Sequence, residues 1–242
     1  MNILIPMAGD GTRFSEKGYT KPKPFIDVDG IPMIAKVIQS LNIRGTYNFV
    51  CHQKHLKIYD IKKLLTSFQI DFNIIEIEKK TDGAARTALM AKDHINNDEP
   101  LIIANSDQFL CWNSNEMLKK FRDEDQDGGI VTFQDSNPKW SFAKIINAQV
   151  VEVAEKKVIS NNATVGVYYW KHGKDFVSFA EEMIAQEIKT NNEYYICPVY
   201  NNAIKANKRI GYYEIAKDSM WGLGTPEDLE YYLKNYDENY CP

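Results

Sequence analysis

Short apolar runs alternate with longer amphipathic segments over the first 105 residues. Runs of β-branched and aliphatic residues, each bounded by polar residues, predict strands at 2–6, 47–52, 72–77 and 100–105. Near-continuous apolar character is typical of strands that are covered on both faces. The segments between them have helical periodicity and predict helices at 32–41, 56–68 and 83–95. This alternation predicts an α/β fold with a parallel sheet and right-handed crossovers.

The pattern changes after Asp107, where strand candidates follow one another closely. They lie at 128–133, 141–147, 149–156 and 163–170, with the acidic segment 122–129 expected as a solvated turn. We therefore expect an antiparallel or mixed extension of the sheet. Helices at about 174–188 and 198–206, a strand at 209–216 and a closing helix that starts near 225 complete the chain.

The closing helix has clear start signals. Thr225 suits the N-cap and Pro226 suits the first helical position. Glu227 and Asp228 then favour the helix dipole.

Composition excludes several kinds of partner. The chain has 242 residues, of which 44% are apolar, and a net charge of −4. This length suffices for one large core, so we expect a single domain over 1–242, and the acidic balance disfavours nucleic acid or an anionic membrane. No apolar run approaches the roughly 20 residues of a membrane span, and no basic segment precedes the first apolar run as in a signal peptide. We expect a cytoplasmic protein whose four scattered cysteines are reduced thiols.

A glycine-containing loop directly follows the first predicted strand, within the stretch IPMAGDGTRFSEKGYTKPKPFIDV. Ligands of open α/β folds bind at the carboxyl ends of the strands, where glycines let backbone N–H groups approach a phosphate. Arg13 and Lys23 add positive charge there. The alternative interpretation is a tight strand-to-helix turn with surface lysines. A dinucleotide fingerprint is excluded because Phe14 stands where the third glycine would be, and the G-K-[ST] of a P-loop is absent.

The longer string AGDGTRF…KPKPFIDVDGIPMI resembles the signature of the nucleotidylyltransferases that make nucleotide-activated sugars and related phospho-metabolites. TDGAARTALMAK, LIIANSDQ, EVAEKK, ATVGVYYW and WGLGTPEDL follow in that family's order. The resemblance implies a Rossmann-like, GT-A-like core with a mainly parallel sheet and a β-rich acceptor-binding extension. It also implies a reaction in which an NTP and a phosphorylated acceptor give an NDP-linked product and pyrophosphate. Residues 1–110 would form the nucleotide-binding half, and 111–242 the acceptor-binding half with the closing helix.

The resemblance assigns the catalytic and phosphate-binding roles. Ala8, Gly9, Gly11 and Thr12 would bind the nucleotide, with Arg13 on the departing phosphates. Lys23 would bridge the α-phosphate and the acceptor, and Lys21 is either a further contact or simply exposed. Asp107 would hold Mg²⁺ on the phosphates, or else cap the following segment, with Asn105, Ser106 and Gln108 beside it.

The second metal acid of the family would stand at Gly222, where this chain has none. Asp218, four residues earlier, is a candidate replacement. In the resemblance Glu155 and Lys156 contact the acceptor, and Thr164 and Gly166 line its pocket; the alternative for the charged pair is a hairpin edge. Tyr194, Tyr195 and Tyr200 either close over the acceptor or pack in the core.

Base recognition is expected within residues 78–86, through Glu78, Asp82, Gly83 and Arg86. A carboxylate such as Glu78 accepts hydrogen bonds and does not donate them, which favours the exocyclic amine of cytosine and hence CTP. The alternative for Arg86 is a solvated helix residue.

The strings IPMAGDGTRF, NSDQ and MWGLGTPEDL are similar to the capsule-cluster branch, which includes a phosphoglutamine cytidylyltransferase. The expected acceptor is thus phosphoglutamine, a sugar phosphate or phosphocholine, for surface-polysaccharide synthesis by a possible homodimer. A GT-A glycosyltransferase that uses an NDP-sugar and a non-catalytic nucleotide-binding module are the alternatives.

Overall fold

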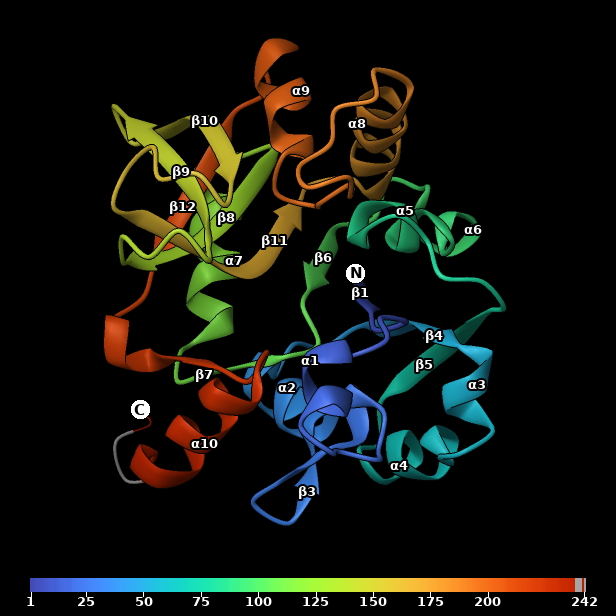
Figure 1. Ribbon diagram of the computed structural model, residues 1–242. Coiled ribbons are helices and arrows are strands. Elements are labelled where there is room, and N and C mark those ends of the chain that lie inside the picture. Colours follow the sequence, from blue (N-terminus) through green and yellow to red (C-terminus); the bar gives the residue numbers. More distant parts are fainter. Residues whose placement is uncertain (238–240, 242) are drawn as a thin grey trace.

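A mixed sheet of nine strands runs through the computed structural model, which describes residues 1–237 and 241 (Figure 1). Its strands are β1 (Asn2–Pro6), β4 (Thr46–His52), β5 (Asp71–Ile77), β6 (Leu101–Ala104), β8 (Gly128–Gln134), β9 (Ser141–Ile146), β10 (Gln149–Glu155), β11 (Asn162–Trp170) and β12 (Ile210–Glu214). The main path follows the order β10-β9-β11-β6-β1-β4-β5, and β8 pairs with both β11 and β12.

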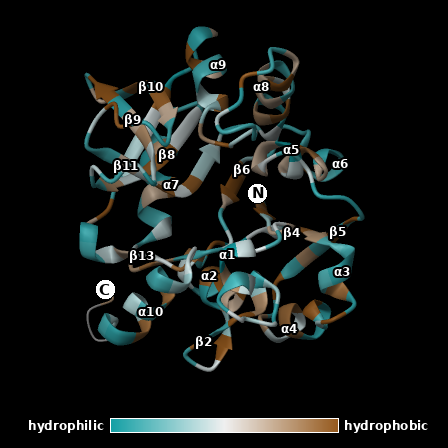
Figure 2. Cartoon of the chain, in the orientation of Figure 1, coloured by the Kyte–Doolittle hydropathy of each residue, from teal (hydrophilic) through white to brown (hydrophobic). Residues whose placement is uncertain are grey.

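The four strands from the first part of the chain form the parallel core of the sheet. β1 pairs in parallel with β4 and β6, and β4 pairs in parallel with β5. Ile3 and Ile5 point into one hydrophobic layer and Leu4 into the other, all three fully buried. Figure 2 shows the same apolar character on β6. The predicted parallel sheet, covered on both faces, is confirmed.

Helices cover the two faces of the sheet. The helices of the described residues are α1 (Thr12–Glu16), α2 (Met33–Leu41), α3 (Gln53–Leu56), α4 (Ile61–Ser67), α5 (Ala84–Leu89), α6 (Lys92–Ile95), α7 (Ser114–Asp123), α8 (Gly173–Ala185), α9 (Val199–Lys205) and α10 (Pro226–Asn235). Of these, α1 and α10 pack in a separate hydrophobic cluster through Phe14 and Leu229. The apolar side chains of α2, α4 and α7 join one core layer, and those of α5, α8 and α9 join the other. Among the described residues, no helix is long and apolar enough to cross a bilayer.

Three local predictions differ from the structure. The helix expected at 56–68 forms only from Ile61, as α4, because the Asp60 side chain accepts from Lys63 N (3.1 Å) and caps a helix there; α3 ends at Leu56, where the expected helix would begin. The helix expected at 83–95 is divided into α5 and α6. The acidic segment 122–129 is not wholly a turn, since α7 runs to Asp123 and β8 begins at Gly128.

The second half of the sheet is antiparallel, except that β12 runs parallel to β8. β11 changes register between Thr164 and Tyr168, where Gly166 has φ +78°. Added there, a Cβ would lie 2.2 Å from Asn105 Nδ2, so only glycine fits this bulge. The expected mixed extension of the sheet is confirmed.

Short pieces complete the chain between the sheet and α10. They are β2 (Asp27–Val28), β3 (Ile31–Pro32), β7 (Gln108–Leu110), β13 (Met220–Gly222), and the 3₁₀ turns η1 (Lys23–Phe25) and η2 (Lys217–Ser219). β7 pairs with β13 in antiparallel fashion and so brings the segment after β6 beside the segment before α10.

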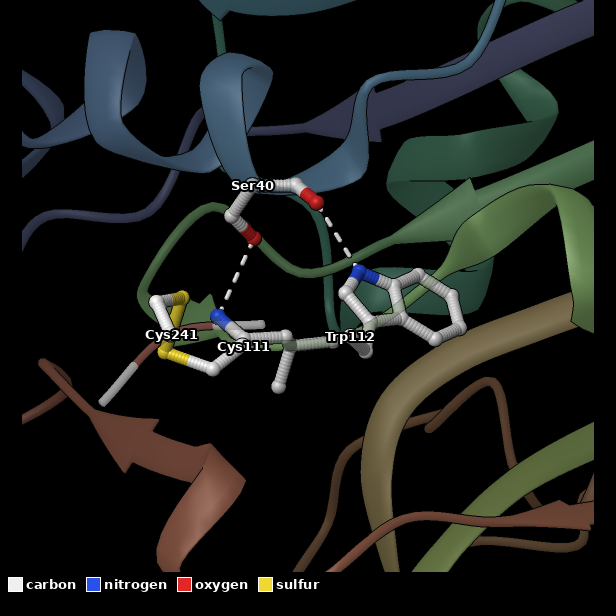
Figure 3. Close-up of a disulfide and its surroundings, with 5 residues drawn as sticks. Ser40, Cys111, Trp112 and Cys241 are labelled. Atoms are coloured by element: carbon white, nitrogen blue, oxygen red, sulfur yellow. Dashed lines mark hydrogen bonds between the residues drawn. A yellow bond between two sulfur atoms is a disulfide. The ribbon is translucent and has the colours of Figure 1, made fainter. Parts of the chain in front are cut away.

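A disulfide joins Cys111, directly after β7, to Cys241 (Figure 3). Ser40 of α2 steadies the same segment, because its Oγ accepts from Leu110 N (3.1 Å) and its carbonyl accepts from Trp112 Nε1 (2.8 Å). The expectation of four reduced thiols is therefore wrong for this pair, whose partners are too distant in sequence to be matched by spacing. Cys51 and Cys197 are free and buried.

Candidate active site

A cleft of about 750 Å³ opens at the carboxyl ends of the parallel strands and extends along the antiparallel part of the sheet. Segments after β1, β5 and β6 line one side, and β9, β10, β11 and the β13–α10 junction line the other. Fourteen of the residues predicted for the site line it: Ala8, Gly9, Gly11, Thr12, Arg13, Lys23, Gly83, Asn105, Ser106, Asp107, Glu155, Lys156, Thr164 and Gly166.

The glycine loop after β1 presents unused backbone donors to this cleft. Among the described residues, no hydrogen bond between backbone groups uses the N–H of Gly9, Gly11 or Thr12 as its donor. The Gly11 carbonyl instead accepts from Phe14 N (2.9 Å) and Ser15 N (3.2 Å), which fixes the turn into α1. The loop is therefore held from one side, while its N–H groups stay free for an anion.

Gly11 also makes room for Lys23. The backbone of Gly11 is left-handed, with φ +64°, and a Cβ there would lie 2.8 Å from Lys23 Cβ. Lys23 begins η1, and the base of its side chain thus lies against the loop, while its ammonium group extends into the cleft. The short contact explains why a bare backbone and a lysine 12 positions later occur together in the sequence.

Asp107 follows β6 and forms an ion pair with Lys23 through Oδ2. The strand pairing of β7 with β13 carries Gly224 against this pair, because Leu223 N donates to the Asp107 carbonyl (2.8 Å). A Cβ on Gly224 would lie 3.0 Å from Asp107 Oδ2. A carboxylate and an ammonium group thus meet in the middle of the cleft, over a glycine.

A second carboxylate reaches the cleft from α10. Asp228 lines it, and a Cβ on Gly222 would lie 3.7 Å from Asp228 Oδ2. The carboxylate thus lies beside the position where the resemblance expects an acid. Asp228 Oδ1 accepts from Lys139 Nζ (2.8 Å), and that ammonium lies 4.5 Å from the centre of the Trp140 ring.

Asp218, the candidate replacement, lies elsewhere. It is exposed on η2 and does not line the cleft, so the structure does not bring it to Asp107. Helical geometry gives the reason, because the start of α10 turns Asp228 back toward β13 whereas η2 turns its own side chains outward.

Glu155 and Lys156 lie at the far end of the cleft. Glu155 Oε2 accepts from Ser141 Oγ, and burial raises the pKa of the Glu155 carboxyl group. Lys156 has a left-handed backbone (φ +53°), and its Nζ donates to Tyr195 Oη (2.7 Å). The hydroxyl group of Thr164 lies 3.1 Å from Tyr168 Oη. This end therefore offers a carboxyl group, an ammonium group and several hydroxyl groups to a polar ligand.

Several predicted residues lie outside the cleft. Glu78, Asp82 and Arg86 line a separate shallow hollow, which adjoins the cleft because Lys80 and Thr81 line both. Asp82 forms ion pairs with Arg86 (2.6 Å) and Lys189 (3.1 Å).

Two of the remaining candidate residues line the cleft and three do not. Lys21 is exposed and does not line the cleft, whereas Gln108 does. Of the three tyrosines, Tyr195 lines the cleft, while Tyr194 and Tyr200 are buried in the core.

Five charged lining residues were absent from the predicted site: Asp10, Lys80, Lys139, Glu193 and Asp228. The sequence assigned Asp228 only to the helix dipole, and the strand pairing that brings α10 to β6 has no short sequence signal. Asp10 and Lys80 each stand one or two residues from a predicted site residue, so a wider window around the glycine loop and Thr81 would have included them.

The acids of the cleft are suited to a magnesium ion shared with a substrate. Over residues 1–237 and 241, no three His, Cys, Asp or Glu side chains gather into a metal-binding group. Asp107 and Asp228 supply carboxylate oxygens, and Mg²⁺ commonly takes one or two of these and completes its shell with phosphates and water. The donor set fits that ion when phosphate oxygens are present.

The chain is similar to known proteins over most of its length. The family model described as nucleotidyl transferase matches residues 3–238. A "Bifunctional protein GlmU" of Methanococcus aeolicus is 25% identical over 235 residues, covering 95% of this chain and 53% of that protein. A "Mannose-1-phosphate guanylyltransferase catalytic subunit beta" of Dictyostelium discoideum is 24% identical over 182 residues, covering 69% of this chain and 49% of that protein. The chain thus spans about half the length of these curated relatives.

Solved structures share the fold over nearly the whole chain. A nucleoside-diphosphate-sugar pyrophosphorylase from Vibrio cholerae RC9 superposes with a TM-score of 0.83 at 25% identity, covering 96% of this chain and 100% of that one. An inositol-1-phosphate CTP transferase from T. maritima gives a TM-score of 0.74 at 15% identity, covering 97% and 96%. The second likeness is one of fold alone.

Proposed function

The chain belongs to the nucleotidyl transferase family, and from this premise we propose that it transfers a nucleotidyl group from an NTP to a small phosphorylated acceptor. The observation that carries the proposal is the meeting of the glycine loop, Lys23 and Asp107 in one cleft. Residues 1–110 hold the nucleotide in this scheme, and residues 111–242 hold the acceptor and complete the site.

The reaction joins two anions, so the protein contributes mainly charge neutralisation and positioning. A phosphate oxygen of the acceptor attacks the α-phosphorus, a new P–O bond forms, and the bond to the β-phosphate oxygen breaks. The electron pair of that bond leaves with pyrophosphate, and no proton transfer is required. The N–H groups of Gly9, Gly11 and Thr12, with Arg13, hold the phosphates that depart, and Lys23 lies between the α-phosphate and the acceptor.

A divalent metal fits the carboxylates of Asp107 and Asp228. Such an ion, when bound, neutralises phosphate charge and aligns the leaving group. Lys23 then exchanges its partner Asp107 for substrate oxygens, and Lys139 does the same for Asp228. Glu155, Lys156, Thr164 and Gly166 hold the acceptor at the far end of the cleft, where Lys156 is close enough to the surface to meet a phosphate.

The choice of nucleotide and acceptor is the finer part of the proposal. We favour CTP, because Glu78 accepts hydrogen bonds only and its hollow adjoins the cleft at Lys80 and Thr81. The acceptor is a sugar phosphate, phosphocholine or phosphoglutamine, and a role in surface-polysaccharide synthesis in the cytoplasm follows from the resemblance of the signature.

Pyrophosphate release tests the proposal directly. The purified protein with Mg²⁺ is supplied with each of four NTPs and a panel of sugar 1-phosphates, phosphocholine and phosphoamino compounds. We expect release with one acceptor class, greatest with CTP, and a fall of about 10²-fold or more in Arg13→Ala and Lys23→Ala. The absence of release with every pair would refute the proposed activity.

Metal dependence is tested with the two acids. Asp107→Asn and Asp228→Asn should each weaken Mn²⁺ binding in the presence of the nucleotide, measured by electron paramagnetic resonance. Asp218→Asn is the matched control, since its carboxylate lies outside the cleft. Equal Mn²⁺ affinity in Asp228→Asn and Asp218→Asn would remove Asp228 from the metal site.

A further inference from the structure

Asp10 is an acid inside a loop that is otherwise suited to anions, and two lysines hold it. Lys54 Nζ donates to Asp10 Oδ1, and Lys80 Nζ lies 3.5 Å from Asp10 Oδ2. The three residues come after β1, β4 and β5, which are adjacent parallel strands. Because the carboxyl ends of parallel strands meet at one edge of the sheet, the three charges converge from distant parts of the chain.

Asp10, Lys54 and Lys80 together carry a net positive charge beside the loop. The hydrogen bond from Lys54 lowers the pKa of Asp10, so its carboxylate is ionised at neutral pH. Two ammonium groups face one carboxylate there, and both Asp10 and Lys80 line the cleft. Lys54 lies just behind them and reaches the loop through Asp10.

We propose that Lys54 and Lys80 are two further cations of the triphosphate site, and that Asp10 is the positioning residue that holds them beside the loop. The inference rests on the proposed function. A lysine loses rotamer freedom when it binds a phosphate, and a carboxylate that already holds its ammonium group reduces that loss. Phosphate oxygens of the incoming nucleotide then take over the two ammonium groups from Asp10.

The opposite role for Asp10 gives an opposite sign in an experiment. An acid that merely repels phosphate would weaken nucleotide binding, and its removal would tighten binding. An acid that positions two cations would strengthen binding, and its removal would weaken it. Asp10→Asn distinguishes the two, and Asp10→Glu restores the charge on a longer side chain.

The test measures the Kd of CTP and of inorganic tripolyphosphate by calorimetry at fixed ionic strength. Tripolyphosphate isolates the phosphate contacts from those to the base. We expect Lys54→Ala and Lys80→Ala each to raise both Kd values about five- to tenfold, less so at high salt because partly exposed charges are screened. Lys57→Ala is the matched control, since Lys57 is an exposed neighbour of Lys54 outside the group and lines neither the cleft nor the hollow, and its Kd values should equal those of the wild type.

For Asp10→Asn we expect both Kd values to rise about fivefold, with Asp10→Glu close to the wild type. A lower Kd in Asp10→Asn would overturn the positioning role, and a wild-type Kd in either lysine variant would remove that lysine from the site. A wild-type protein that binds neither probe would instead refute the proposed function, which keeps the two failures apart.

Discussion

At the scale of single residues, Gly11 is restricted both by its own backbone and by a neighbour. Alanine at φ +64° would strain the backbone, at a cost of about 1 kcal/mol, and its Cβ would meet Lys23 at 2.8 Å. We expect Gly11→Ala to displace Lys23 and to lower kcat/KM about 10²-fold in pyrophosphate release.

Gly18 provides the control for this change. It is also left-handed, with φ +87°, but a Cβ there would meet no atom within 4 Å. Gly18→Ala should lose a similar amount of stability in urea unfolding and keep its activity. Equal activity losses in the two variants would show that backbone strain, and not the position of Lys23, is responsible.

Glu155 couples the function of the acceptor end to its stability. Burial raises its folded-state pKa above the ordinary value of 4.5, so the folded protein binds the proton of this carboxyl group more tightly than the unfolded chain does. The protonated Glu155 therefore stabilises the folded protein at pH values below 4.5, and this contribution to the unfolding free energy is lost as the pH rises through the raised pKa. Glu155→Gln has no such loss, so its advantage in unfolding free energy over the wild type should grow from pH 4 to pH 8.

The same variant should have lower activity, because an amide replaces the carboxylate that faces the acceptor. Thermal unfolding measured at a series of pH values checks the first expectation, and acceptor KM checks the second. A difference in stability that does not change with pH would contradict the assignment of the raised pKa to Glu155.

The place in the cleft could be predicted for residues of the signature motifs, but not for residues that only tertiary pairing brings there. The loop residues 8–13, Lys23 and Asp107 belong to a signature whose spacing fixes their place at the strand ends. Asp228 reaches the cleft only because β13 pairs with β7, and neither strand has more than three residues. Glu78 lies in the adjoining hollow and not in the cleft, which could not be predicted because a position in the sequence does not show which side of a loop a side chain faces.

At the scale of elements, α10 positions one wall of the cleft through its first turn. Thr225 Oγ1 accepts from Asp228 N (3.1 Å), so the N-cap and the carboxylate in the cleft are held by one hydrogen bond. Thr225→Ala should lower the unfolding free energy by about 1 kcal/mol and also reduce turnover. Chemical denaturation and pyrophosphate release measure the two effects.

The N-cap of α7 provides a control in which a similar loss of stability is expected away from the cleft. Asn113 accepts from Asn115 N and Glu116 N and lies outside the cleft. Asn113→Ala should lose similar stability and retain turnover. A loss of turnover as large as in Thr225→Ala would indicate a general loss of folded protein.

The sequence predicted which elements exist better than where they are interrupted. The parallel strands were located to within one residue because their apolar runs are bounded by polar residues. The helix at 56–68 was predicted too long and the helix at 83–95 as continuous, because periodicity extends beyond the helical residues, whereas the start of α4 depends on the local cap at Asp60. The bulge at Gly166 depends on contact with Asn105, which only the folded sheet supplies.

At the scale of the whole molecule, the disulfide connects two walls of the cleft. Cys111, which is bonded to Cys241 (Figure 3), directly follows β7, while Cys241 follows α10 in the sequence. Cys111 lies in a hydrophobic cluster with Phe14, Leu223 and Leu229, and the partly buried Cys241 packs against this cluster. The bond therefore tethers the helix that carries Asp228 to the strand that follows Asp107.

Reduction of this bond should destabilise the whole molecule and loosen the cleft. The two cysteines are 130 residues apart, and the chain-entropy model gives a stabilisation of up to roughly 5 kcal/mol for such a loop. We expect a reductant to lower the Tm of the wild type and to reduce turnover, because α10 loses its tether. Cys241→Ser should have the lower Tm without reductant and should not respond to it further, which excludes an effect through the buried Cys51 and Cys197. A wild-type Tm that is the same with and without reductant would show that the bond does not contribute to stability. That result would restore the expectation of a protein that works with reduced thiols, as is usual in the cytoplasm.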